Sequence, residues 1–135
     1  MALIVWGKDF SVGIESIDEQ HKQLIALVNG FHEAMLQRQG KPVMEKLLDG
    51  LVDYTIRHFA HEERLFSEHG YQDMKEHKKQ HDALAKEVSR FSKDLHAGRP
   101  VLSVEVMSFL KEWLQEHIQG TDMKYSAFLK SRGVL

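Results

Sequence analysis

Two short segments decide how this chain folds: HFAHE at residues 58–62 and HKKQH at residues 77–81. Each places two possible metal ligands four residues apart, His58 with Glu62 and His77 with His81. Residues four apart on an α-helix differ by about 40° around its axis, so each pair projects from one helical face. The two segments therefore predict two helices that each carry imidazole or carboxylate groups on a single side.

Apolar residues recur around these pairs with the same helical period. Four stripes in steps of three and four residues contain the possible ligands: Ile17, His21, Leu24, Val28, Phe31 and Met35; Met44, Leu47, Leu51, Thr55, His58, Glu62 and Leu65; Met74, His77, His81, Leu84, Val88, Phe91 and Leu95; Leu102, Val106, Phe109, Trp113 and His117. Such stripes bury one face of each helix, as a helical bundle requires. Turns are predicted at residues 37–41, at Gly70 and at residues 97–99, where glycine or proline interrupts the pattern.

The predicted fold is therefore all-α. It is an antiparallel up-down-up-down four-helix bundle with an irregular N-terminal arm over residues 1–16 and a short C-terminal helix over residues 122–131. In an antiparallel hairpin, residues equally far from the turn lie at the same height. His21 and His58 are equally far from the first turn, and the ligands of the other two hairpins are centred on their turns in the same way. The spacing predicts one level at which all four helices contribute ligands.

The last pair of possible ligands has a different spacing. His117 is followed five residues later by Asp122, and on a continuous α-helix these residues are about 140° apart. Both cannot then face inward. Gly120 suits a C-terminal stop, so we expect the fourth helix to end there and Asp122 to turn inward, either from the turn or from the first residues of the last helix.

The residue types indicate the kind of metal. Five of the nine histidines lie in the stripes, whereas His32, His61, His69 and His96 do not and are expected to be solvated. Taken alone, His21 is more simply explained as a hydrogen-bonded core histidine. Five histidines and two carboxylates at one level would need many polar partners without metal, however. Seven ligands exceed the four of tetrahedral zinc and suit two ions bridged by carboxylates, and nitrogen-rich ligation favours iron over magnesium or calcium.

Composition sets wider limits on the function. The chain has 135 residues, no cysteine and a formal net charge of −2. This length predicts one domain over residues 1–135, and the charge does not favour binding to nucleic acid or to an anionic membrane surface. The lack of cysteine excludes disulfides and thiolate chemistry. No stretch reads as a signal sequence or a membrane span, so a cytoplasmic protein without membrane insertion is expected.

The ligand pattern His…His-x-x-x-Glu…His-x-x-x-His…His-x-x-x-x-Asp resembles that of the hemerythrin family, of the single-domain bacterial type. Flanking residues are also similar: Trp6, Phe10-Ser11-Val12-Gly13-Ile14, Ile17-Asp18, Gln20, Phe59, Glu63 and Gly120-Thr121. The resemblance covers essentially the whole chain. It implies reversible dioxygen binding at a non-haem di-iron centre with an oxo or hydroxo bridge, and so an oxygen carrier, store or delivery protein and not an enzyme.

The resemblance also implies roles for individual residues. It assigns His77, His81 and His117 to a coordinatively full iron, and it assigns His21 and His58 to the iron that binds oxygen. Glu62 and Asp122 would bridge the two iron ions. The apolar residues that resemble the oxygen pocket of the family are Leu24, Phe59, Trp113, Leu114 and Ile118.

Two other functions stay open at this stage. One is a sensor of oxygen, iron or redox state, for which 135 residues leave no room for an output domain unless a partner supplies it. The other is a di-iron enzyme that acts on peroxide or nitric oxide, which would need an open site and often a proton donor, whereas the expected pocket is apolar. For the favoured function the expected partners are dioxygen and an oxygen-consuming enzyme, and a monomer is expected.

Overall fold

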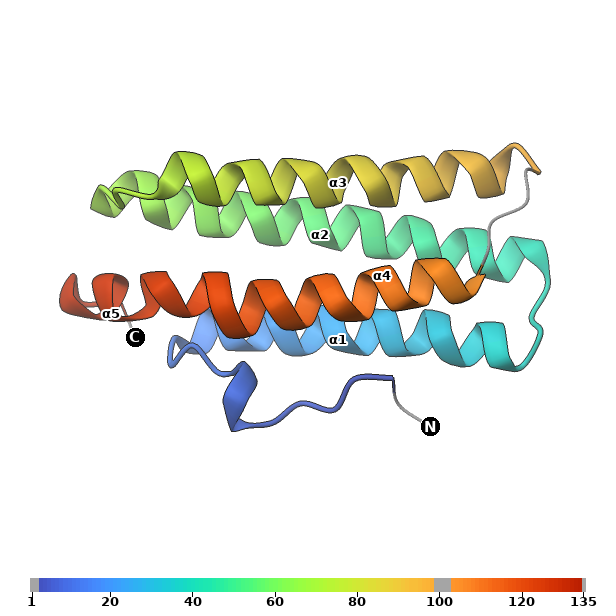
Figure 1. Cartoon of the computed structure of the whole chain (residues 1–135), viewed down its shortest axis with the longest axis horizontal. Helices are drawn as coiled ribbons and strands as arrows, with labels where there is room; N and C mark the ends of the chain where they lie inside the picture. The colour runs from blue at the N-terminus through green and yellow to red at the C-terminus, as the bar shows by residue number, and fades with distance from the viewer. Residues whose placement is uncertain (1–2, 99–102, 135) are drawn as a thin grey trace.

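The computed structural model describes the backbone of residues 3–98 and 103–134, and their side chains except those of residues 103–105. The bundle helices are α1 (Glu15–Leu36), α2 (Lys41–His69), α3 (Met74–His96) and α4 (Ser103–Glu116), which lie side by side and alternate in direction (Figure 1). A short π-helix, η2 (His117–Asp122), joins α4 to α5 (Met123–Ser131). Helix α2 packs against α1 and α3, and α1 packs against α4. The prediction of an all-α up-down-up-down bundle is confirmed.

The N-terminal arm is irregular, as predicted, but specific contacts fix it to the bundle. It runs beside α1 and contains one 3-10 turn, η1 (Lys8–Phe10) (Figure 1). Asn29 on α1 exchanges two hydrogen bonds with the backbone of Ile4, at 2.9 and 2.8 Å. Asp18 accepts a hydrogen bond from the backbone N–H of Val12 at 2.8 Å. Because Ile4 and Val12 are also buried, the arm forms part of the core.

Glycine and proline mark the described turns as the sequence predicts. Gly70 follows α2 in the left-handed conformation, with φ 69°, which glycine adopts without steric cost. Pro42 lies in the first turn of α2, where its missing N–H removes no helical hydrogen bond. Gly98 also has a positive φ, of 72°. The predicted helix start at Pro100 and the stripe position Leu102 lie outside the described residues.

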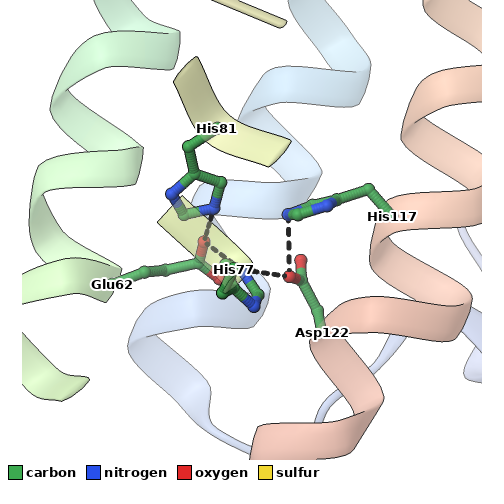
Figure 2. A group of neighbouring side chains, drawn as sticks. All are labelled: Glu62, His77, His81, His117 and Asp122. Carbon is green, nitrogen blue, oxygen red and sulfur yellow. Dashed lines mark ion pairs between the residues drawn. The ribbon is translucent and has the colours of Figure 1, made fainter. Parts of the chain in front are cut away.

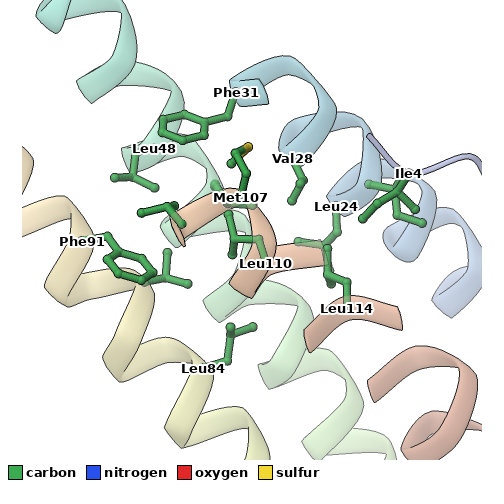
Figure 3. Close-up of a cluster of buried hydrophobic side chains, with 14 of the residues drawn as sticks. Ile4, Leu24, Val28, Phe31, Leu48, Leu84, Phe91, Met107, Leu110 and Leu114 are labelled. Atoms are coloured by element: carbon green, nitrogen blue, oxygen red, sulfur yellow. The ribbon is translucent and has the colours of Figure 1, made fainter. Parts of the chain in front are cut away.

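The core consists of two apolar clusters separated by a polar layer. The larger cluster fills most of the bundle and includes Leu24, Val28, Leu48, Leu84, Leu110 and Leu114 (Figure 3). The smaller one lies toward α5 and contains Val12, Ile14, Ile17, Phe66, Tyr125 and Leu129. None of the helices within the described ranges is long and apolar enough to cross a membrane.

The predicted stripe of α2 differs from the fully buried face by one residue near each end. Leu47 and Leu65 are partly buried and pack against the core, whereas the fully buried residues are Leu48 and Phe66. Alternating steps of three and four average 3.5 residues per turn, and an α-helix has 3.6. A drift caused by this difference would move the inward face in opposite directions at the two ends, whereas both shifts are one residue toward the C-terminus. Packing against the neighbouring helices, and not the period, therefore decides which of two adjacent apolar residues is fully buried.

The predicted break at Gly120 is also wrong. The helical backbone continues from α4 through η2 into α5. In a π-helix the backbone hydrogen bond joins residues five apart, so residues five apart lie on one face. His117 and Asp122, the first and last residues of η2, can therefore both point inward without a break.

Candidate metal centre

All seven predicted ligands are buried, and they form the polar layer between the two apolar clusters. Four helical segments contribute them: His21 lies on α1, His58 and Glu62 on α2, His77 and His81 on α3, and His117 and Asp122 on η2. The four histidines that were expected to be solvated are all partly or fully exposed. The structure thus brings together every member of the predicted ligand set.

Five of these residues face one point (Figure 2). Glu62, His77, His81, His117 and Asp122 each offer a ligand atom, and these atoms lie within 4.8 Å of one another. Asp122 Oδ1 lies 3.0 Å from Nε2 of His77 and 3.0 Å from Nε2 of His117. Glu62 Oε1 lies 3.0 Å from Nε2 of His81. Two ligand atoms that bind one ion at about 2.1 Å and at right angles are about 3.0 Å apart, so these distances suit a single ion.

A second group lies beside the first. Its members are His21, His58 and, again, Glu62, whose ligand atoms also lie within 4.8 Å of one another. Glu62 Oε1 is 3.4 Å from Nε2 of His58, and Asp122 Oδ2 is 3.1 Å from Nε2 of His21. Each carboxylate therefore faces imidazoles of both groups, and Asp122 does so with two different oxygens. The arrangement has three imidazoles on one side and two on the other.

The atoms at the centre make no hydrogen bond of acceptable geometry within the described residues. They are Nε2 of His21, His77, His81 and His117, Oε1 of Glu62, and both carboxylate oxygens of Asp122. Buried polar atoms are normally paired, and each one left unpaired costs about 1–3 kcal/mol. Converging imidazole nitrogens and carboxylate oxygens are a donor set that suits a first-row transition metal, so the residues fit a metal centre.

Three of the imidazoles are oriented through their second ring nitrogen. Each Nδ1–H donates to a side-chain oxygen: that of Gln20 for His58 at 2.7 Å, of Glu63 for His81 at 3.0 Å and of Gln80 for His117 at 3.0 Å. With the proton on Nδ1, the lone pair lies on Nε2 and points to the centre. Gln20 and Glu63 entered the sequence analysis only as flanking residues, and Gln80 was missed.

A further contact holds Glu62 from the side of α5. The Tyr125 hydroxyl donates a hydrogen bond to Glu62 Oε2, and both residues are fully buried. Tyr125 was not predicted from the sequence. Its place three residues after Asp122, near the same side of the last helix, is the signal that could have found it.

The charges of the site indicate that it attracts cations. Burial alone lowers the pKa of His21 and His77, but the adjacent carboxylates of Asp122 and Glu62 outweigh it and raise both pKa values to about 9. Burial prevails at His58 and lowers its pKa to about 4. Burial also opposes ionisation of Asp122, yet the surrounding imidazoles hold its pKa well below the usual range. The carboxylates thus stay negative and draw positive charge into the centre.

An apolar cavity of about 10 Å³ adjoins the polar layer within the larger cluster. Four of the five predicted oxygen-pocket residues line it: Leu24, Phe59, Trp113 and Leu114. Ile118 is buried but lies outside this lining. The other lining residues were not predicted as part of this pocket; they are Val28, Leu51, Thr55, Leu84, Val88 and Leu110. A space of this size holds about one molecule as small as water.

Known proteins are similar to this chain in sequence and in fold. A family model described as the hemerythrin HHE cation binding domain matches residues 12–129. A bacteriohemerythrin of Stenotrophomonas maltophilia is 39% identical over 97% of this chain and 84% of its own length. A bacteriohemerythrin of Methylococcus capsulatus is 32% identical over 97% of this chain and 100% of its own length. The crystal structure of a wild-type hemerythrin matches with a TM-score of 0.89 at 32% identity, covering 95% of this chain and 98% of that one.

Proposed function

The chain belongs to the hemerythrin family, and from this membership we propose that it binds dioxygen reversibly at a pair of iron ions. Membership makes it an oxygen-binding domain that depends on iron. The number of ions and the physiological role are part of the proposal: two ions per chain, in a protein that carries, stores or delivers oxygen.

One observation carries the proposal of two ions. Glu62 and Asp122 each face imidazoles of both groups, and Asp122 does so with Oδ1 on one side and Oδ2 on the other. A carboxylate that serves a single ion has no need of imidazoles on both sides. We assign His77, His81 and His117 to one ion and His21 and His58 to the other, with the two carboxylates as bridges.

Iron, when bound, supplies the electrons and the open coordination position that dioxygen binding requires. The side chains do the rest. The Nδ1 partners hold three imidazoles in the tautomer that presents Nε2, and Tyr125 holds Glu62 in place. The cavity wall next to Phe59 and Leu114 excludes water from the polar layer.

The same wall favours binding over turnover. Apart from the Thr55 hydroxyl, the side chains that line the cavity are aliphatic or aromatic. An enzyme that reduces peroxide or nitric oxide would need a proton donor within hydrogen-bond reach of its substrate. No carboxylate or imidazole lines this cavity within the described residues, which supports an oxygen-binding role.

Metal analysis together with absorption spectroscopy tests the proposal. We expect two irons per chain, and an absorption band that appears when the reduced protein meets air and disappears when oxygen is removed. His58→Gln should reduce the iron content. His61→Gln, on the same helix but partly exposed, is the matched control and should leave the iron content unchanged. One iron per chain, mainly zinc, or depletion by His61→Gln but not by His58→Gln would contradict the assignment.

A further inference from the structure

The partners of the three oriented imidazoles differ in charge. Gln20 and Gln80, which accept from His58 and His117, are neutral amides, whereas Glu63, which accepts from His81, is a carboxylate. Among the described residues, Glu63 is thus the one charged acceptor on an Nδ1 of the ligand set. We propose that Glu63 acts through His81 on the ion that we assign to His77, His81 and His117. Its negative charge stabilises the oxidised form of that ion relative to the reduced form. This inference rests on the proposed function.

Glu63 lies between the surface and the buried centre. Its side chain is 25% exposed and lines a surface cleft of about 240 Å³ between α2 and α3, with Lys78 and Asp82 nearby. Water therefore reaches the carboxylate. By contrast, the His81 side chain that it contacts is only 1% exposed. A single hydrogen bond therefore links a solvent-exposed carboxylate to an imidazole of the buried centre.

His81 does not need Glu63 for its orientation alone. The ring of Phe59 stacks on the imidazole, with the ring centroids 3.7 Å apart and the planes 3° from parallel. Nε2 is thereby directed toward Glu62, 3.0 Å from its Oε1. A neutral acceptor in place of Glu63 would keep the tautomer, so what the carboxylate adds is charge.

That charge has a definite direction of effect. Two divalent ions bring four positive charges, and Glu62 and Asp122 offset two of them. A third carboxylate, acting through an imidazole, makes that ligand a stronger base and stabilises the more positive, oxidised form of the ion. Removing the charge should therefore favour the reduced form. Outer partners of this type change metal affinity or activity about 10- to 100-fold.

The test exchanges glutamate and glutamine at the partners of the imidazole Nδ1 atoms, so the charge changes while each Nδ1–H keeps a hydrogen-bond acceptor. In Glu63→Gln we expect roughly a tenfold shift of the oxidised-to-reduced ratio toward the reduced form at fixed potential, or about 59 mV for one electron. Gln80→Glu keeps Glu63 and adds a second carboxylate, next to His117, so it should shift the oxidised-to-reduced ratio toward the oxidised form. The double variant Glu63→Gln/Gln80→Glu should return toward the parent potential.

A purely structural role for Glu63 gives a different result. Both single variants would then shift in the same direction, and the double variant would be no closer to the parent than either one. That outcome, or an unchanged potential in Glu63→Gln with full iron content, overturns the inference. Zinc affinity of metal-free protein, measured by competition with a chelator, is a second readout and should fall about tenfold in Glu63→Gln. Failure of the proposed function is distinct, because the parent protein itself would then lack two irons or oxygen binding.

Discussion

Tyr125→Phe tests whether the hydrogen bond from α5 stabilises the carboxylate that joins the two halves of the site. The variant removes one oxygen and leaves the aromatic ring in place. The ring packs against Phe66, with the centroids 5.0 Å apart, so the packing contribution should change little. What is lost is the hydroxyl that donates to Glu62 Oε2, in a position where both residues have an exposed fraction of 0%.

The size of the effect follows from the charge of the acceptor. A hydrogen bond to a charged group contributes about 1.5–3 kcal/mol, and the carboxylate oxygen left behind is buried. We expect the free energy of unfolding to fall by about 2 kcal/mol and the melting temperature by roughly 4–10 °C for a chain of this length. Burial and the charges of Asp122 and Glu62 raise the pKa of Tyr125 well above its usual value, so the hydroxyl stays protonated. The loss should therefore be the same from about pH 5 to pH 9.

Urea unfolding of both proteins, followed by circular dichroism at matched iron content, measures this loss. Tyr71→Phe is the control, because Tyr71 belongs to the same aromatic cluster but is only partly buried. It should change the free energy of unfolding by less than about 0.5 kcal/mol. If Tyr125→Phe were as stable as the parent within that margin, the hydrogen bond from the hydroxyl to Glu62 would not stabilise the protein.

Other perturbations test the rest of the site. Asp122→Asn keeps the size of the side chain but removes its charge, so metal analysis should show loss of at least one iron per chain, whereas full iron content would exclude Asp122 as a bridge. In protein stripped of metal, His21 and His77, with pKa values of about 9 against 6.5, contribute stability that is full below pH 6.5 and is lost as the pH rises through 9. Urea unfolding at both pH values should show this loss in stripped protein but not in loaded protein, where metal replaces the protons. Leu114→Ala should destabilise the fold by roughly 3–4 kcal/mol, since it removes three carbons at about 0.8 kcal/mol each and enlarges the adjoining cavity; it should also speed the decay of the oxygenated form in air, at unchanged iron content.

The sequence predicts the bundle well because the period of its apolar residues is local information. Any helix with such a stripe must bury it, and short turns leave few ways to do so. The exact inward face of a long helix is less predictable, as Leu48 and Phe66 show. A shift of one residue between neighbouring leucines is decided by packing between helices, which the pattern does not contain.

The ligand set was predictable for a related reason, and the supporting residues were not. Ligands stand out because histidine and glutamate interrupt an apolar stripe. Gln20, Glu63 and Gln80 interrupt nothing, since each occupies an ordinary polar position. They share one feature, however: each is next in sequence to a ligand, and about 100° from it on the helix. A side chain so placed points toward a neighbouring helix, where it meets the imidazole of a different ligand.

The π-helix also leaves a signal in the sequence, in the spacing of its two ligands. Two inward residues on one α-helix must be three, four or seven apart, and His117 and Asp122 are five apart in a stretch with no proline. Gly120 makes a helix break the simpler prediction, but a break would release the last helix from the bundle axis. A single widened turn instead keeps α5 in line, so that Tyr125 and Leu129 stay buried while Asp122 reaches both groups of histidines. The distorted turn is stable because the contacts that it lets Asp122 make with the imidazoles of His21, His77 and His117 outweigh one irregular stretch of backbone hydrogen bonds. Two inward ligands five residues apart in a helical sequence are therefore a signal for a π-turn at a functional site.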